Sequence, residues 1–468
     1  MEHVKRISEI IEQKKETFIE ISDSIWNFAE TRFEEYQSAE LLCTTLENEG
    51  FTVEREVGNI ETAFIGSFGT GKPVVAIMGE FDALSGMSQK KATARQEPIA
   101  QGENGHGCGH NLLGTGSLAA AVAVKQYMEE NSLSGTVRYY GCPGEEGGSG
   151  KTFMVREGLF DDADFAFCWH PLDVNGIMAM DSLSNFQVYF KFKGKSSHAA
   201  ASPHLGRSAL DAVELMNVGV NYLREHIIQE ARVHYAITNS GGASPNVVQQ
   251  DAEVLYLVRA PEVSQVQDIY LRVCNIARGA ALMTGTEVEI VFDKACSNVI
   301  QNNVLESVMY KNFEELGIPQ HDDNEKNLAS EVRATLSEQE RNSTVIPDKN
   351  GQNEAMANWL EPIESLQSPL TGSSDVGDVS WIVPTAQCTT ACFVLGSPLH
   401  SWQWVTLGST SIAHKGMLHA GKVIAATAVE VLQNPALIDQ AKSELDERLQ
   451  GKVYVSPIPQ DVSPSVKK

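Results

Sequence analysis

Residues 74–84, VVAIMGEFDAL, form the segment that decides the fold. A short apolar run that ends in acidic residues is typical of a strand buried on both faces of a sheet. Residues 112–130 then have the apolar spacing of a helix, and residues 136–144 and 164–171 have the character of two further buried strands. Strands that alternate with helices predict an α/β fold, with a mostly parallel sheet and helices on both of its faces.

The pattern changes at about residue 184, where a β-α-β-β-α-β order begins. The strands are expected at 186–194, 232–240, 253–261 and 287–293, and the helices at 208–225 and 263–283. This is the split βαβ order of a small ferredoxin-like α+β domain. Alternation of strands and helices resumes afterwards, with 388–400 as a further buried strand. We therefore predict a discontinuous catalytic domain, residues 1–183 and 298–468, interrupted by an inserted domain at 184–297.

Two stretches resist assignment from the sequence. Residues 321–372 are polar and show no clear period. The end of the chain, residues 453–468, has the Pro and Ser content of a loose tail.

Composition excludes several classes of function. With a formal net charge of −25, the chain lacks the basic surface that binding to nucleic acids or anionic membranes requires. No stretch reaches the ~18 consecutive apolar residues of a membrane span, and the N-terminus has amphipathic helical spacing rather than the pattern of a secretory signal. The eight cysteines are scattered without a CxxC pair. These features predict a reduced, cytoplasmic protein.

Several side chains that can bind a metal or move a proton fall at the carboxyl ends of the predicted strands or in the adjoining loops. They are Asp82, Cys108, His110, Glu145, Glu146, His170 and His400. Singly, each has a plainer explanation: a lone Cys is usually a small buried apolar residue, a lone His a structural group, and two adjacent Glu a solvated turn. In an open α/β sheet, however, the carboxyl ends of the strands share the functional crevice. We therefore expect these residues to converge there.

The chemistry of this set suits a divalent cation. Thiolate, imidazole and carboxylate together favour an ion of the Mn or Zn type, since sulfur favours zinc and carboxylate favours manganese. One glutamate of the pair can bind metal while its neighbour takes a proton from the attacking water.

Four short motifs resemble the two-metal aminoacylase and glutamate carboxypeptidase family, in particular its branch that hydrolyses aromatic N-acyl amino acids. They are CGH at 108–110, EE at 145–146, WHP at 169–171 and PLHS at 398–401. The resemblance implies that Glu145 is the catalytic acid and base and that Asp82 supports the site. It also implies five metal ligands for two divalent ions, namely Cys108, His110, Glu146, His170 and His400.

The same resemblance adds three residues from the inserted domain, which it makes a lid and dimerisation domain. His198 in KSSHAA and Asn246 in SPNVV would polarise the scissile carbonyl, and Arg259 in LYLVRAPE would clamp the substrate carboxylate. From the residues alone, Arg is the side chain of choice for a bidentate grip on a carboxylate. A solvent-facing ion pair is the plainer explanation for Arg259.

Three other histidines are rivals to this assignment. His414 and His419 lie among small apolar residues on a predicted helix, where His414 is better explained as a structural hydrogen-bond donor. His106 lies two residues before Cys108 and could compete as a ligand, although its glycine-rich surroundings also suit an ordinary loop position.

The sequence thus predicts a metal-dependent amidohydrolase with two Mn or Zn ions per chain. The resemblance extends over long runs such as NGHGCGHNLLGT at 104–115, and it implies p-aminobenzoyl-glutamate as the substrate. The alternatives are a broader N-acyl amino acid hydrolase or dipeptidase, and a mainly structural subunit of a heteromeric hydrolase. The resemblance is compatible with a homodimer and with a heterodimer that contains a related subunit, called A. The negative net charge argues against nucleic acid or a membrane as a partner.

Overall fold

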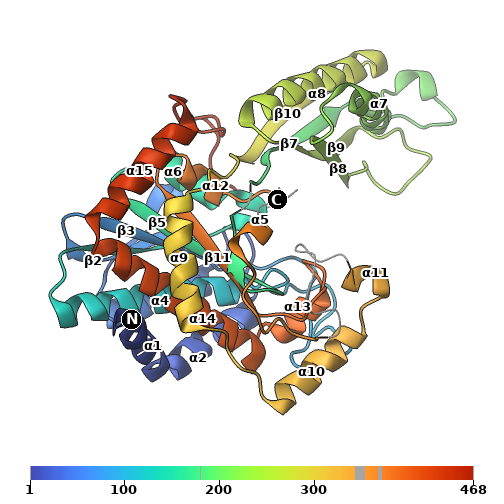
Figure 1. Cartoon of the computed structure of the whole chain (residues 1–468). Helices are drawn as coiled ribbons and strands as arrows, with labels where there is room; N and C mark the ends of the chain where they lie inside the picture. Colours follow the sequence, from blue (N-terminus) through green and yellow to red (C-terminus); the bar gives the residue numbers. More distant parts are fainter. Residues whose placement is uncertain (1, 180, 343–353, 367–371, 467–468) are drawn as a thin grey trace.

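The computed structural model describes residues 2–179, 181–342, 354–366 and 372–466, and these form two sheets (Figure 1). The larger sheet has the order β1-β2-β4-β3-β5-β11-β6. Its strands are β1 (Thr52–Arg55), β2 (Phe64–Thr70), β3 (Val74–Glu80), β4 (Gly135–Cys142), β5 (Phe165–Leu172), β6 (Gly176–Ile177) and β11 (Thr385–Ala391). The four central strands, β4, β3, β5 and β11, are parallel, and antiparallel strands flank them on both sides. The expected mostly parallel sheet is confirmed at its centre, and the antiparallel strands β1, β2 and β6 were not foreseen.

Two long helices anchor the central strands. Every residue of β3 is buried, and α4 (His110–Asn131) and α14 (Ser411–Leu432) pack against each other and against the sheet. Their close approach depends on glycine: a Cβ atom on Gly116 of α4 would lie 2.7 Å from the Trp169 ring of β5. The N-terminal helices α1 (Glu2–Gln13) and α2 (Lys15–Phe28) contact α4 and α14. The first residue of α4, His110, is thereby fixed beside the ends of the parallel strands.

The remaining helices surround this core. They are α3 (Tyr36–Asn48), α5 (Glu145–Gly148), α6 (Gly150–Arg156), α9 (Asn303–Leu316), α10 (Asp323–Ala334), α11 (Glu338–Arg341), α12 (Val376–Ser380), α13 (Trp402–Leu407) and α15 (Pro435–Leu449). Helices α10 and α11 fall in the stretch 321–372 that the sequence left unassigned. Each begins with a capping box, formed by Asp322 with Glu325 and by Ser337 with Glu340. Residues 343–353 and 367–371 of that stretch lie outside the described residues.

The smaller sheet contains β7 (Ser184–Lys193), β8 (Arg232–Asn239), β9 (Asp251–Ala260) and β10 (Glu287–Cys296) in the antiparallel order β10-β7-β9-β8. Helices α7 (Ala209–Leu223) and α8 (Val263–Thr284) pack on each other and on this sheet. The chain order is therefore β-α-β-β-α-β, as in a ferredoxin-like fold. This unit stands at the upper right of Figure 1, apart from the larger sheet.

A buried ion pair joins the two units. The Arg32 guanidinium donates to both carboxylate oxygens of Asp293 on β10, at 2.8 and 3.0 Å, and both side chains are buried. Arg32 also donates to the carbonyl of Gly147, which follows the two adjacent glutamates in α5. One arginine therefore connects the smaller sheet to the segment that carries the candidate catalytic residues.

Two further observations bear on the composition. All eight cysteines lie in the described ranges and are free thiols. Among the described residues, no helix combines the length and the apolar character needed to cross a membrane.

Candidate active site

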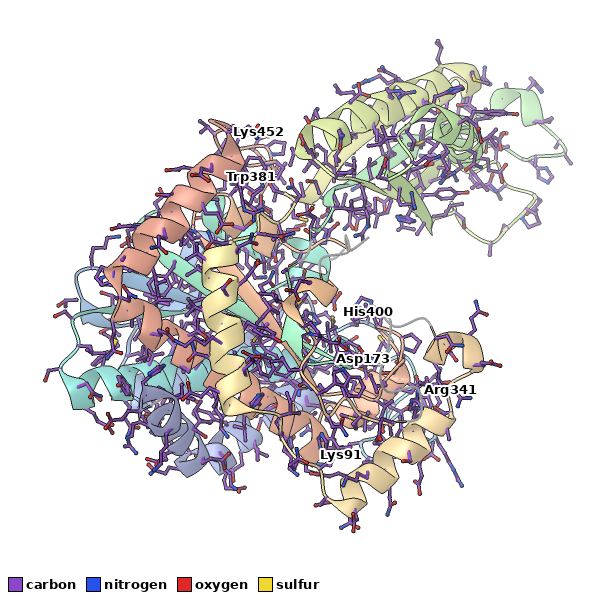
Figure 2. All side chains as sticks on the ribbon, viewed as in Figure 1. Lys91, Asp173, Arg341, Trp381, His400 and Lys452 are labelled. Carbon is purple, nitrogen blue, oxygen red and sulfur yellow. The ribbon has the colours of Figure 1, made fainter. Side chains whose placement is uncertain are left out.

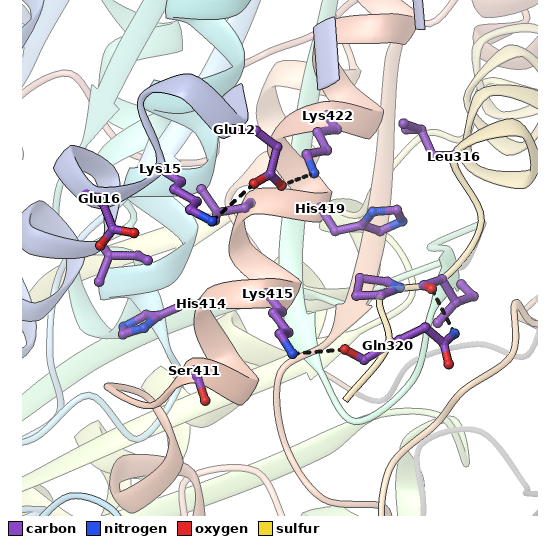
Figure 3. Close-up of a pocket in the computed structure, with 14 residues that line it drawn as sticks. Glu12, Lys15, Glu16, Leu316, Gln320, Ser411, His414, Lys415, His419 and Lys422 are labelled. Atoms are coloured by element: carbon purple, nitrogen blue, oxygen red, sulfur yellow. Dashed lines mark hydrogen bonds and ion pairs between the residues drawn. The ribbon is translucent and has the colours of Figure 1, made fainter. Parts of the chain in front are cut away.

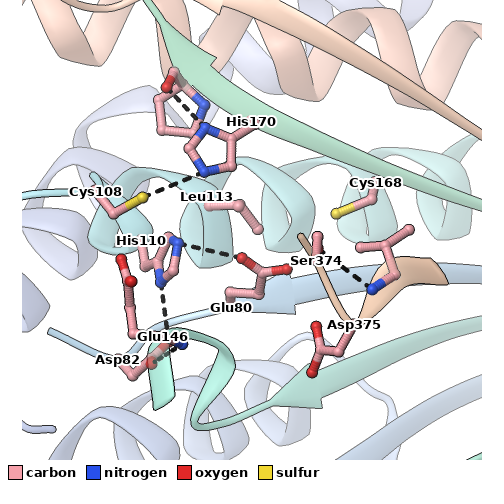
Figure 4. A network of polar contacts seen from close by, with 12 residues as sticks. Glu80, Asp82, Cys108, His110, Leu113, Glu146, Cys168, His170, Ser374 and Asp375 are labelled. Atoms are coloured by element: carbon pink, nitrogen blue, oxygen red, sulfur yellow. Dashed lines mark hydrogen bonds and ion pairs between the residues drawn. The ribbon is translucent and has the colours of Figure 1, made fainter. Parts of the chain in front are cut away.

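The five predicted ligands come from four segments that meet at the carboxyl ends of the parallel strands, and Figure 4 shows four of them, Cys108, His110, Glu146 and His170. Asp82 follows β3, and Cys108 and His110 stand at the start of α4. Glu145 and Glu146 follow β4, directly after Gly144, whose φ of 67° provides the sharp turn. His170 lies within β5. His400 follows β11 and has a φ of 58°, a left-handed conformation that non-glycine residues rarely adopt. Figure 2 marks its place at the surface of the larger unit.

Two groups of potential ligands share one cysteine. The ligand atoms of Cys108, His110 and His170 lie within 4.8 Å of one another, and so do those of Cys108, Glu146 and His400. Cys108 Sγ is 3.4 Å from His170 Nε2, and His400 Nε2 is 3.3 Å from Glu146 Oε1. The structure thus brings together all five residues that the sequence proposed as ligands, in two overlapping groups.

Hydrogen bonds orient the two buried imidazoles so that Nε2 of each faces the cluster. His110 donates from Nδ1 to Asp82 at 2.9 Å, and the other Asp82 oxygen accepts from the Glu146 backbone N–H at 2.9 Å. His170 donates from Nδ1 to the Pro171 carbonyl at 2.9 Å. A proton on Nδ1 leaves the Nε2 lone pair available for a metal. Asp82 therefore acts on the site through residues that it holds in place.

Two buried atoms at this site have no hydrogen-bond partner among the described residues, His110 Nε2 and Glu146 Oε1. Each of them lies 3.3 Å from an ion-pair partner without hydrogen-bond geometry, His110 Nε2 from Glu80 Oε2 and Glu146 Oε1 from His400 Nε2. Unsatisfied buried polar atoms cost free energy, and a cation is one of the groups that can satisfy them. The donor set and these unsatisfied atoms fit a divalent metal site.

The two adjacent glutamates have opposite electrostatic environments. Burial raises the pKa of Glu145 to about 8, and the carboxylates of Glu80 and Asp375 act in the same direction. Burial opposes ionisation of Glu146 too, but its ion pair with His400 and the charge of His110 lower its pKa to about 2. Carboxylates whose pKa values are driven apart are suited to different roles. Glu145 can hold a proton near neutral pH, whereas Glu146 stays anionic.

The histidines also differ in charge. Burial lowers the pKa of His170 to about 4, which leaves a neutral imidazole able to coordinate a metal. The Cys108 and Glu146 side chains raise the pKa of His400 to about 11. Burial raises the pKa of the Cys108 thiol, and a bound divalent cation would deprotonate such a ligand.

A fully buried lysine lies next to this cluster, and sequence reasoning missed it. Lys151 Nζ is 2.6 Å from Glu80 Oε1 and 2.5 Å from Asp375 Oδ1. Its side chain is 0% exposed, and those of Glu80 and Asp375 are at most 3% exposed. We call Lys151, Glu80 and Asp375 the buried ion triplet. The acidic end of β3 was the one signal for Glu80, whereas nothing in the sequence links residues 151 and 375.

Glu35 is a second missed residue. Its buried Oε1 accepts hydrogen bonds from the backbone N–H groups of Phe33 and Gly144, each at 2.9 Å. Burial raises the pKa of Glu35 to about 8, and the charge of Asp82 acts in the same direction. Glu35 thereby holds the turn that precedes the two adjacent glutamates.

A cavity of about 310 Å³ extends from the cluster to the smaller sheet. Glu145, Glu146, His170 and His400 line it on one side, and Asn185, Arg259 and Lys294 line it on the other. Its apolar lining consists of Trp169, Leu172, Met178, Val299 and Leu399. Arg259 donates to Ser373 Oγ at 2.9 Å and has no carboxylate partner among the described residues. Burial lowers the pKa of Arg259.

His198 and Asn246 do not reach this cavity in the single chain. Both are exposed on the smaller unit, where His198 pairs with Val247 in an isolated bridge. His198 Nδ1 accepts from the backbone N–H groups of Ala200 and Ala201, at 3.2 and 3.1 Å. The proton of the neutral ring is therefore on Nε2, which remains available as a donor.

The rival histidines lie elsewhere. His414 and His419 line a separate cavity between α14 and the N-terminal helices (Figure 3). His414 Nε2 is 2.8 Å from Asp23 Oδ1, and the His419 ring is 5.0 Å from that of Phe313. His106 donates from Nε2 to the Ile25 carbonyl at 2.9 Å.

Comparison with known proteins places this site in a family. Residues 76–457 match the model of peptidase family M20/M25/M40. The chain is 53% identical to the B subunit of p-aminobenzoyl-glutamate hydrolase from Escherichia coli, over 98% of each chain. It is 28% identical to the Xaa-Arg dipeptidase of Mus musculus, over 95% of this chain and 93% of the relative.

Solved structures share the fold. The YXEP protein of Bacillus subtilis, described as a dinuclear metal binding peptidase of the M20 family, has a TM-score of 0.54 at 18% identity, covering 90% of this chain and 99% of its own. An aminobenzoyl-glutamate utilization protein of Klebsiella pneumoniae has a TM-score of 0.55 at 14% identity, covering 88% and 98%. The chain belongs to peptidase family M20/M25/M40 and is a hydrolase.

Proposed function

We propose that this protein hydrolyses the amide bond of p-aminobenzoyl-glutamate to give p-aminobenzoate and glutamate. The observation that carries the proposal is one cavity lined by four of the five proposed ligands and by Arg259, which has no carboxylate partner among the described residues. The 53% identity to an Escherichia coli protein named for that activity, over nearly the whole of both chains, supports the choice of substrate.

Two divalent ions fit the ligand groups. We assign Cys108, His110 and His170 to one ion and Cys108, Glu146 and His400 to the other. When bound, such ions supply Lewis-acid polarisation of a carbonyl oxygen and lower the pKa of water. The thiolate favours zinc and the carboxylate favours manganese, so we propose Mn or Zn.

Glu145 is the proposed general base and acid. It lines the cavity, and the raised pKa matches a group that takes a proton from water and returns it to the leaving nitrogen. Asp82 keeps the His110 ring in one tautomer and holds the Glu146 backbone, so we assign it a positioning role.

Substrate binding is proposed for the opposite side of the cavity. Arg259 can grip a carboxylate, because its one side-chain partner among the described residues is the neutral Ser373 hydroxyl. The apolar lining suits an aromatic acyl group.

The smaller unit is the proposed lid and dimerisation domain. His198 and Asn246 lie outside the cavity in one chain, so we propose that domain closure or a second subunit brings them to the scissile carbonyl. The second subunit is another copy or a related A subunit, since the Escherichia coli relative is named as one of two subunits.

Metal analysis combined with turnover tests the proposal. The purified chain should contain about two divalent ions and release p-aminobenzoate, and chelation should abolish turnover until Mn or Zn is restored. Rates across acyl groups distinguish this function from a broader acylase, and activity of the chain alone distinguishes it from a structural subunit. Full activity without metal would refute the proposal.

A further inference from the structure

A second cation faces the same cavity as Arg259. Lys294 on β10 is 7% exposed and lines the cavity together with Glu145 and His400. Within the described residues its ammonium group has no ion pair and no hydrogen bond with protein. The side chain is buried, but its ammonium group reaches the open space of the cavity. Lysines with so little exposure are usually paired, so an anionic ligand in the cavity is the expected partner.

The adjacent carboxylate does not neutralise Lys294. Asp293 is the extra residue of a β-bulge, so Asp293 and Lys294 both oppose Gln187 of β7. The Asp293 carboxylate is already engaged by Arg32, at 2.8 and 3.0 Å, and by the Gln187 amide, at 2.7 Å. The bulge therefore separates a satisfied carboxylate from an unsatisfied cation.

Strand register places Lys294 near Arg259. Arg259 pairs with Asn185 on β7, and Asn185 pairs with Cys296 on β10. Lys294 is two residues before Cys296, so all three cavity-lining residues lie on one face of the sheet. Asn185 Oδ1 is also buried without a hydrogen-bond partner among the described residues. In a chain of net charge −25, this face presents to one cavity two cations that have no carboxylate partner among the described residues.

We propose that Lys294 binds the side-chain carboxylate of an acidic amino acid in the substrate, while Arg259 binds the α-carboxylate. The inference rests on the proposed function, and it adds the residue that recognises the side-chain carboxylate of the glutamate. A carboxylate on the substrate side chain forms an ion pair with Lys294. A side-chain amide leaves Lys294 without an ionic partner, and a guanidinium repels it. The site thus differs from what an Xaa-Arg substrate would require.

Matched amides test the assignment. The ratio of kcat/KM for p-aminobenzoyl-glutamate to that for p-aminobenzoyl-glutamine is measured on metal-loaded wild type, Lys294→Met and Lys294→Gln. Wild type should prefer glutamate, and the ratio should fall about 10- to 100-fold in both variants, mainly through KM, as expected for a lost contact between charges. Lys294→Arg should retain most of the preference. Lys193→Met, an exposed lysine of the same sheet, is the matched control and should leave the ratio unchanged.

Two further measurements separate this inference from the proposed function. If neither p-aminobenzoyl amide is cleaved, the proposed function fails, and N-acetyl-glutamate and N-acetyl-glutamine provide the same ratio. Thermal unfolding with free L-glutamate or L-glutamine requires no turnover: glutamate should stabilise wild type more than glutamine does, and Lys294→Met should lose that difference. An unchanged ratio in folded Lys294 variants, or equal stabilisation by both amino acids in wild type, would overturn the role of Lys294.

Discussion

The two sides of the cavity differ in whether their cations are paired with carboxylates. On the side of the larger sheet, Lys151 is paired with two buried carboxylates. On the side of the smaller sheet, Arg259 and Lys294 have no carboxylate partner among the described residues. Lys151 and Lys294 are both buried, so burial alone does not distinguish the two sides.

The presence or absence of a carboxylate partner distinguishes residues that stabilise the structure of the site from residues that are available to bind a ligand. A paired buried charge stabilises only in the presence of its partner, and removing one member leaves the other uncompensated. An unpaired buried cation instead makes folding less favourable, and an anionic ligand compensates for it on binding. We therefore expect substitutions on the large-sheet side to damage the fold or the chemistry, and those on the small-sheet side to alter recognition.

The largest effect is expected at the two adjacent glutamates. Glu145→Gln should lower kcat by ~10² to 10⁴ with unchanged metal content, because the proton-transfer group is removed and the ligands stay in place. Glu146→Gln should lower metal content, measured by elemental analysis after dialysis. If metal loss follows Glu145→Gln and turnover loss alone follows Glu146→Gln, the two roles are reversed.

The buried ion triplet gives the next effect. Lys151→Met should lower the free energy of unfolding by ~3 to 5 kcal/mol, because Glu80 and Asp375 remain buried without the lysine that they share. Lys294→Met is the matched comparison and should not lower stability. Urea unfolding at equal metal content measures both. Equal destabilisation by the two substitutions would remove the distinction between the two sides.

These two lysines also show the limits of the sequence. The alternation of strands and helices predicted the central sheet and the carboxyl-end position of the ligands, because strand ends can be located from periodicity. Lys151 and Asp375 are 224 residues apart, and no local pattern links them. Lys294 faces the cavity only through the bulge at Asp293, and strict alternation gives no sign of a bulge. Strands β1 and β6 are too short for a clear period.

Substitution of His198 tests whether one chain alone supplies all the residues of the small-sheet side of the active site. His198→Ala should lower kcat by ~10² to 10³ with normal metal content, as for the loss of one donor to a developing oxyanion. If a second copy supplies this residue, mixing the His198→Ala and Glu145→Gln chains should restore some activity. A mixed dimer then contains one site that has both an intact Glu145 and an intact His198. No rescue after demonstrated subunit exchange would favour closure within one chain or a partner of another type. Full activity of His198→Ala alone would exclude the residue from the reaction.

The smallest predicted effect is the loss of folding stability caused by a buried charge without an ionic partner, tested at Glu306, outside the cavity. Glu306 on α9 is 3% exposed, accepts a hydrogen bond from the Asn302 backbone N–H, and forms no ion pair among the described residues. Burial raises the pKa of Glu306 from 4.5 to about 7. Because the folded-state pKa is the higher one, folding favours the protonated acid, and stability falls as pH rises from about 4.5 to about 7. This shift corresponds to a maximum of ~3 kcal/mol.

Glu306→Gln removes this titration while its amide carbonyl can still accept the Asn302 hydrogen bond. The variant should therefore be more stable than wild type at pH 8, by up to ~3 kcal/mol, and nearly equal to it at pH 4. Thermal or urea unfolding at the two pH values measures the difference, and Glu314→Gln, at an exposed carboxylate of the same helix, serves as the control for a change of net charge. A variant no more stable than wild type at pH 8 would mean that this chain accommodates an unpaired buried charge without cost, and the unpaired state of Lys294 would then cease to be an argument for a ligand.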